Sequence, residues 1–329
     1  MKSALYLLAA FLPFRVLPIQ VSTPAKAQNP RIEPHQDYDT DLYWEFNLDQ
    51  DEAQYVDRCE IIQYENLNVQ LTCGIIRSHL RAYDYGAALE AARSIRPFLN
   101  ERTWKLLESA KMRLTLNWRA LDYETKQMFG LSGSNHHRND LAEQLLWLQL
   151  KQKRGDLSDF LRGLTPALFA LLRVAVEEKC GYPLSKYCDR FEKLHRDRLE
   201  MDELGRRMLS MLENRGRKFD SAFLISAHYA AILVAEAIRA PWAQKLLTLR
   251  AIEEQLRNRV AHTITCVDEA WIRREQKSGT PMSSSEIMAL LRGAVQDLND
   301  DPDRPLKQKL LIRWDSYDRL NRELEQMLP

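Results

Sequence analysis

The sequence predicts a mainly α-helical protein that carries a small α/β segment near its amino terminus. Three observations support this fold class. From residue 66 onward, apolar residues recur at the three- and four-residue spacing of amphipathic helices. Polar turns that contain Gly or Pro separate these segments. One short run of strand-forming residues, 16–21, lies ahead of them.

The first stretch of the chain allows two interpretations. Residues 4–14 are largely apolar and precede the strand-like run, which is the pattern of an α/β unit. The same apolar run, with Lys2 before it and Ala-Lys-Ala at residues 25–27, is also typical of a secretory signal with its cleavage site. Arg15 follows the apolar run at once and disfavours the signal. If the segment is a signal, the mature protein begins at Gln28.

Composition shifts divide the rest of the chain. Residues 29–47 are polar and acidic and predict an exposed connector. We therefore predict an α/β segment at residues 1–28, a linker at 29–55, a helical middle domain at 56–139 and a helical bundle at 140–329.

Several local patterns within these domains make testable predictions. Residues 128–139 form a Gly/Ser/Asn/His-rich loop, and no further ligands lie near its His136 and His137, so we expect no metal there. Residues 186–217 are heavily charged without an obvious buried face, which predicts a solvated helix or a mobile connection. Ser283 with Glu286 predicts a capping box at the start of a helix.

Bulk properties bound the function loosely. Lys and Arg number 47 against 46 for Asp and Glu, so any contact with nucleic acid is expected in a local cleft rather than over a broad basic surface. The five cysteines are scattered and odd in number, which indicates a reducing, cytoplasmic compartment. No Cys-x2-Cys pair indicates zinc, and no membrane partner is expected. The cysteines are Cys59, Cys73, Cys180, Cys188 and Cys266.

One short stretch carries residues suited to chemistry. Arg257, Asn258 and His262 lie late in a predicted helical run, residues 242–273. The buried stripe predicted for that run is Trp242, Leu246, Leu249, Ile252, Leu256, Val260 and Ile264. A solvated arginine and a satisfied, buried histidine on an amphipathic helix would produce the same spacing.

Histidine and arginine are the residue types that metal-free cleavage of RNA requires. The ribose 2′-OH can attack the adjacent phosphorus if a group exchanges protons near neutral pH, where histidine titrates. An arginine that never deprotonates can stabilise the charge that develops on the phosphate oxygens. The sequence shows no carboxylate cluster for a metal.

The spacing of these residues places a limit on a site built from one helix. Side chains advance about 100° per helical residue, so Arg257 and His262 would point about 140° apart. Asn258 and His262 are four residues apart and share a face. Either Arg257 lies in an irregular first turn, or the groove is composite and contains two copies of the motif.

Arg257-Asn258-x-x-Ala261-His262 in its helical setting resembles the active-site motif of HEPN ribonucleases. Residues 1–28 are similar to the last part of a Rossmann-like CARF sensor domain, and residues 37–45 resemble the linker of type III-A CRISPR accessory ribonucleases, which combine CARF and HEPN domains. In that family a Ser-Gly-Thr-Pro loop precedes a helix that begins with Met. This chain begins at Met1, where such a helix would start, so we expect most of the sensor to be missing.

The resemblance covers almost the whole chain and implies a function. It implies a HEPN bundle at residues 140–329 and a metal-independent endoribonuclease of single-stranded RNA in antiviral defence. It also implies a cytoplasmic homodimer that cyclic oligoadenylate switches on. Arg257 and His262 carry over as catalytic residues, and Asn258 carries over as a supporting polar residue. No cofactor or metal is implied. Because the activator-binding loop is expected to be absent, its residues remain unknown and no response to cyclic oligoadenylate is expected.

Two other classes of protein remain open. A helical interaction protein, in which Arg257 and His262 are incidental, would not cleave RNA. A secreted helical protein would lose residues 1–27 and be exported.

Overall fold

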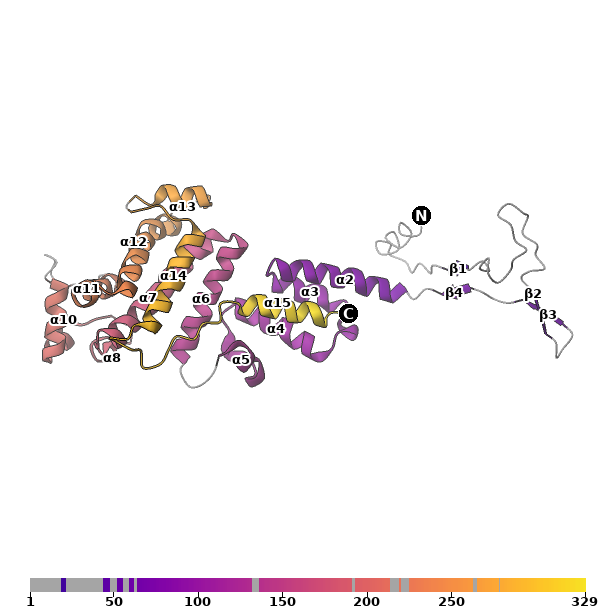
Figure 1. Ribbon diagram of the computed structural model, residues 1–329, viewed down its shortest axis with the longest axis horizontal. Coiled ribbons are helices and arrows are strands. Elements are labelled where there is room, and N and C mark those ends of the chain that lie inside the picture. The colour runs from indigo at the N-terminus through magenta and orange to yellow at the C-terminus, as the bar shows by residue number, and fades with distance from the viewer. Residues whose placement is uncertain are drawn as a thin grey trace.

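The computed structural model describes residues 19–21, 44–47, 52–55, 59–61, 64–131, 136–190, 193–213, 219, 225–262, 265–277 and 279–329. Within these residues the molecule is built almost entirely from α-helices, joined to a few short strands near the amino terminus (Figure 1). The mainly α fold class predicted from the sequence is confirmed.

Two antiparallel strand pairs precede the helices. β1 (Ile19–Val21) pairs with β4 (Cys59–Ile61), and β2 (Trp44–Asn47) pairs with β3 (Glu52–Tyr55). The predicted strand at 16–21 is confirmed over β1, and the predicted helix at 4–14 lies outside the described residues.

The predicted connector and linker contain regular structure that the composition did not indicate. β2 alternates large apolar and polar residues, Trp-Glu-Phe-Asn, which suits a strand more than an irregular connector. β4 also lies where a helical domain was predicted to have begun. Strands this short carry too little periodicity to stand out beside polar, acidic neighbours.

The first hydrophobic core lies among helices from two distant parts of the chain. It is enclosed by α2 (Tyr64–Arg81), α3 (Tyr85–Arg93), α4 (Glu101–Leu114), α5 (Tyr123–Phe129) and α15 (Ser316–Met327). In Figure 1, α15 lies beside α2, α3 and α4 although more than half of the chain separates them in sequence.

Polar caps set where these helices begin. Asp84 caps α3 and accepts a hydrogen bond from the backbone N–H of Ala87. Asn100 caps α4 and Asp122 caps α5 in the same way. Each side chain satisfies a backbone donor that the first helical turn leaves unpaired, and this fixes the start of the helix.

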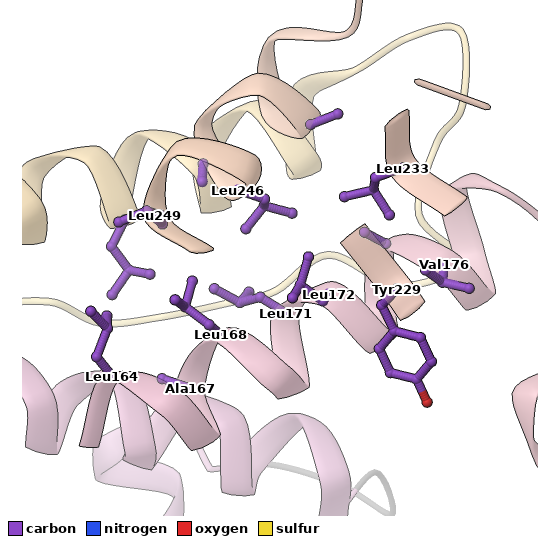
Figure 2. Close-up of a cluster of buried hydrophobic side chains, with 14 of the residues drawn as sticks. Leu164, Ala167, Leu168, Leu171, Leu172, Val176, Tyr229, Leu233, Leu246 and Leu249 are labelled. Carbon is purple, nitrogen blue, oxygen red and sulfur yellow. The ribbon is translucent and has the colours of Figure 1, made fainter. Parts of the chain in front are cut away.

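The second core lies in a larger helical bundle. Its main helices are α6 (His136–Arg154), α7 (Leu157–Val174), α11 (Ile225–Ala237), α12 (Pro241–His262) and α14 (Ser284–Asp300). Figure 2 shows leucines of α7, α11 and α12 meeting in this core, with Leu168 and Leu171 opposite Leu246 and Leu249. The predicted capping box of Ser283 and Glu286 is confirmed at the start of α14.

The charged stretch at 186–217 has a buried face after all. Its described part contains α9 (Arg196–Glu200), α10 (Glu203–Glu213) and the end of α8 (Leu184–Tyr187). Leu199, Met208, Leu209 and Leu212 are buried in the second core. Gly205 allows the start of α10 to lie close to α9, because a Cβ at this position would collide with the backbone carbonyl of Leu199. The prediction of a solvated segment is therefore wrong. A few apolar residues are enough to anchor this segment in the core. A composition dominated by charged residues does not reveal them.

The bounds predicted for the loop at 128–139 are wrong at both ends. α5 continues to Phe129, and α6 begins at His136, with residues 132–135 outside the description. His136 packs near Trp118, with 5.9 Å between the ring centroids, and His137 is exposed in the first turn of α6. The predicted helical run at 242–273 is likewise two helices, since α12 ends at His262 and α13 spans Glu269–Glu275.

A buried ion pair joins the two cores. Arg113 of α4 donates two hydrogen bonds to Glu143 of α6, with Nε–Oε2 and Nη2–Oε1 distances of 2.9 and 2.8 Å. Both side chains are 0% exposed. The guanidinium carbon lies 4.0 Å from the ring centroid of Phe129 and 4.4 Å from that of Tyr317. This cluster, the Arg113 junction, connects α4, α5, α6 and α15 through a single charged group.

Candidate functional site

The candidate site lies at the carboxyl end of α12, and packing fixes the orientation of that helix. The apolar stripe predicted from the sequence is confirmed over the described residues, Trp242, Leu246, Leu249, Ile252, Leu256 and Val260, all of which are buried. Ile264 lies outside the described residues. A stripe of this kind turns one face of the helix into the bundle and leaves the opposite face to solvent.

A polar network fixes α12 against α7 about one turn before the motif. Arg250 and Glu253 are both buried on α12, with 2.7 Å between Arg250 Nη1 and Glu253 Oε2. Thr165 of α7 donates a hydrogen bond of 2.6 Å to Glu253 Oε1. Arg250 Nε is buried without a hydrogen-bond partner among the described residues, so the network is only partly satisfied. The hydrogen bond from Thr165 to Glu253 still ties the register of α12 to that of α7.

α12 brings Arg257 and His262 onto one regular helix. Both lie within its helical span, well beyond its first turn at Pro241. The possibility that Arg257 lies in an irregular first turn is therefore wrong. Their Cα–Cβ directions differ by about 140° around the axis. The side chains of Asn258 and His262 lie outside the described residues.

The side chain of Arg257 carries a charge that no described residue neutralises. Its side chain is half-buried and makes no hydrogen bond or ion pair with another described residue. The neighbouring Arg259 is different, since it pairs with Glu275 of α13. Of Arg257 and Arg259, only Arg257 has no ion pair with a described residue.

Arg162 of α7 adds a second cation near the motif. Its Nη2 donates to the backbone carbonyl of Val260, at 3.4 Å, while its Nη1 lies 3.8 Å from Asp159 Oδ1, and 60% of its side chain is exposed. The carbonyls in the last turn of a helix lack helical partners, and a cation there is favourable. Sequence reasoning missed Arg162, because nothing local to α7 indicates that it reaches the end of α12.

α13 and the residues just after it also contact the end of α12. The backbone N–H of Lys277 donates to Gln255 Oε1 at 2.6 Å, and α13 also supplies Glu275 to Arg259. Asp268 caps α13 through the N–H of Trp271. These contacts hold the chain that follows the motif close to α12.

Neither a metal site nor a membrane span is evident in the described part of the chain. No group of three or more His, Cys, Asp or Glu side chains there could hold a metal ion. None of the described helices is both long and apolar enough to span a membrane.

Comparison with known protein families accounts for this arrangement. A sequence model of the Cas_Csm6 HEPN domain matches residues 130–325. A model of the 6H domain of the CRISPR-associated protein Csm6 matches residues 62–114, and a model of the Cas_Csm6 CARF domain matches residues 1–70. The matched HEPN residues contain the second core and the candidate site. The predicted domain boundaries remain predictions, because neighbouring matches overlap or leave gaps.

Individual relatives agree with these matches. The chain is 27% identical over 327 residues to the CRISPR system endoribonuclease Csm6 of Mycobacterium tuberculosis, covering 98% of this chain and 71% of that protein. The structure of Enterococcus italicus Csm6 bound to cyclic hexa-2′-fluoro-hexa-dAMP has the same fold, with a TM-score of 0.65 at 17% identity, over all of this chain and 72% of that one. Because the HEPN model alone matches more than half of the residues, the chain belongs to the Csm6 family, with CARF, 6H and HEPN domains.

Proposed function

We propose that this protein cleaves single-stranded RNA without a metal ion, using Arg257, Asn258 and His262 at the end of α12. The predicted enzyme class, an endoribonuclease, is confirmed by the HEPN match and the curated relative. The observation that carries the assignment of residues is the half-buried Arg257, whose charge no described residue neutralises, on the same helix as His262.

The proposed reaction follows from these residue types. The ribose 2′-oxygen forms a bond to the adjacent phosphorus, and the bond from phosphorus to the 5′-oxygen breaks. His262 transfers the proton that the 2′-oxygen loses to the leaving 5′-oxygen. Arg257 stabilises the negative charge on the phosphate oxygens. The products are a 2′,3′-cyclic phosphate and a 5′-hydroxyl. Asn258 lies four residues before His262 on the same helix and so shares its face, which gives it a supporting role beside the histidine.

The direct test is cleavage of a short RNA in the presence of a chelator. We expect the wild-type chain to cleave and His262→Ala to lose about 10²–10⁴-fold in rate. His137→Ala is the matched control, because His137 is an exposed histidine on α6 outside the site. Equal rates for His262→Ala and wild type would refute the catalytic assignment, and cleavage only on addition of a divalent metal would refute the mechanism.

The helix geometry favours a homodimer with composite sites. Residues that point about 140° apart on one helix do not converge on one phosphate, whereas two copies related by a twofold axis bring Arg257 of one protomer near His262 of the other. This arrangement can be tested by mixing two inactive variants, Arg257→Ala and His262→Ala. In random heterodimers one of the two composite sites keeps both groups, which restores about a quarter of the wild-type activity.

The control experiment for dimerisation is the oligomeric state. Sedimentation should show a dimer for each variant and for the mixture. No restored activity in a mixture that forms dimers would mean that each protomer builds its own site. A monomer with full activity would exclude the composite groove.

Control of the nuclease by cyclic oligoadenylate, in type III CRISPR antiviral defence, is a separate proposal. It is supported by the CARF match at residues 1–70 and by the ligand in the Enterococcus structure. Titration of the purified chain with cyclic tetra- and hexa-adenylate, with cleavage followed alongside, tests it. A rise in rate supports control through these residues, whereas no binding, or binding without a change in rate, would refute it.

A further inference from the structure

A groove far from the motif follows one face of α15. It has a volume of about 410 Å³ and lies between α15 and the end of α5, and its lining includes Met128, Arg313, Ser316, Arg319 and Arg322. Its lining residues on α15 run from 316 to 326, which corresponds to a length of about 15 Å. Its volume is in the range of binding sites rather than of packing defects.

Three arginines give this groove a net positive charge, although Asp318, which pairs with Lys153, also interacts electrostatically with Arg322. Arg319 and Arg322 are exposed and make no hydrogen bond or ion pair with another described residue. Arg313 donates a hydrogen bond of 2.9 Å to the carbonyl of Met128 rather than to a carboxylate. The single carboxylate of the lining, Glu323, already pairs with Arg102 at 2.7 Å.

Arg313 is held in place before any ligand arrives. The backbone of Gly130 has a φ of +74° at the end of α5, and a Cβ there would lie 2.7 Å from Arg313 Nε. The absence of a side chain at Gly130 therefore makes room for the guanidinium. A cation that is already positioned loses less freedom when it binds an anion.

A buried, unpaired hydroxyl lies in the same groove. Ser316 lines the groove and is 4% exposed, yet its Oγ has no hydrogen-bond partner among the described residues. Most buried polar side-chain atoms in proteins do have a partner, so such a group calls for an explanation. Because protein atoms cover this oxygen, a ligand oxygen would supply the missing partner only after a small shift of the lining side chains.

We propose that this groove binds the phosphates of single-stranded RNA. The inference extends the proposed function, since it assigns a second contact to the same substrate class. An elongated groove with arginines on successive turns suits consecutive phosphates of a strand better than one compact anion. The lining offers no exposed aromatic ring for stacking, because Phe129 is buried against Arg113. The contact is therefore expected to be electrostatic and independent of base sequence.

The test measures how affinity depends on salt. The probe is a 2′-O-methylated single-stranded RNA, which cannot be cut by its own 2′-oxygen, bound to the full chain. Each phosphate contact to a single strand contributes about 0.7 to the slope of log K against log salt, so Arg319→Gln with Arg322→Gln should flatten the slope by about 1.4. We expect Kd to rise on the order of tenfold at low salt.

Matched variants separate this effect from a general loss of charge. Lys111→Gln with Arg239→Gln removes two exposed cations elsewhere, and should leave the slope unchanged. Ser316→Ala removes an uncharged partner, and should raise Kd about three- to tenfold with the same slope. Thermal unfolding of the two double variants should match wild type, because the replaced cations are exposed.

The outcome is independent of catalysis. Binding of the 2′-O-methylated probe requires no cleavage, so a failure of the catalytic assignment leaves this inference standing. No binding by wild type, or an unchanged slope in the double arginine variant, would overturn it. Binding of ATP with no binding of RNA would assign the groove to a free nucleotide and would also overturn it.

Discussion

Two arginines in this molecule occupy opposite situations. Arg113 is fully buried at the junction of the cores, where Glu143 and two aromatic rings absorb its charge. Arg257, at the end of α12, is half-buried and keeps a charge that no described residue balances. The comparison shows that residue type alone does not separate a structural arginine from a catalytic candidate. What separates them is the charge that remains after the surroundings are counted.

The largest expected effect comes from breaking the Arg113 junction. Glu143→Ala leaves a buried cation without its partner and should cost about 3–5 kcal/mol of unfolding free energy. Denaturant unfolding measures it. Arg113→Met combined with Glu143→Leu removes both charges and should cost much less, because no charge is left unpaired. Equal losses for the single and double variants would mean that packing, and not charge, dominates the junction.

Removing Arg257 should lower the rate of cleavage and leave the unfolding free energy almost unchanged, which is the reverse of the effect of Glu143→Ala. Arg257→Ala is expected to lower the rate of RNA cleavage about 10²–10³-fold, with a change in unfolding free energy within about 0.5 kcal/mol. Arg257→Lys keeps the charge but not the planar fork of donors, and should recover only part of the rate. Loss of stability as large as in Glu143→Ala would place Arg257 among the structural arginines.

Arg162 tests whether the end of α12 depends on its neighbour. Arg162→Gln removes the cation next to the Val260 carbonyl, and we expect up to about a tenfold loss of cleavage rate, as for a modest electrostatic contact. Arg93→Gln on α3 is the control, an exposed arginine in the middle domain. If the two variants cleave at the same rate, Arg162 has no part in the site.

The smallest effect concerns the pH dependence of stability where α15 meets the middle domain. Burial acts to raise the pKa of Asp318, but hydrogen bonds from Lys153 and Tyr83 outweigh it and hold the pKa below its ordinary value of 3.8. A folded-state pKa below the unfolded value adds stability above the unfolded pKa, and that contribution is lost as the pH falls through the folded one.

Asp318→Asn should therefore make unfolding free energy depend less on pH between about 5 and 3 than in wild type. Denaturant unfolding at several pH values measures the two profiles. Parallel profiles would show that Asp318 is not a source of the acid sensitivity.

Features set by local sequence were predictable, and features set by distant partners were not. The stripe of α12 and the capping box of Ser283 follow from spacing within one helix, and the structure confirms them. Arg113 and Glu143 gave no signal as isolated charges, because each acquires its role from a residue on another helix.

The same reasoning applies to the candidate site. The motif could be located from one helix, whereas Arg162 comes from α7 and the Thr165–Glu253 contact crosses between helices. The roles of Arg257, Asn258 and His262 remain predictions, since they depend on a substrate and a second protomer. The buried face of residues 186–217 was not predicted, because its few apolar residues lie among many charged ones.

The return of α15 to the first core has a consequence for synthesis on the ribosome. Leu320 and Leu324 belong to the core that begins at Val69, so that core stays open until they emerge. The residues from 131 onward add roughly 200 positions, which take on the order of 10–40 seconds to translate. During this time the apolar faces of α2, α3 and α4 lack their cover, and a nascent chain of this kind is a natural client for chaperones.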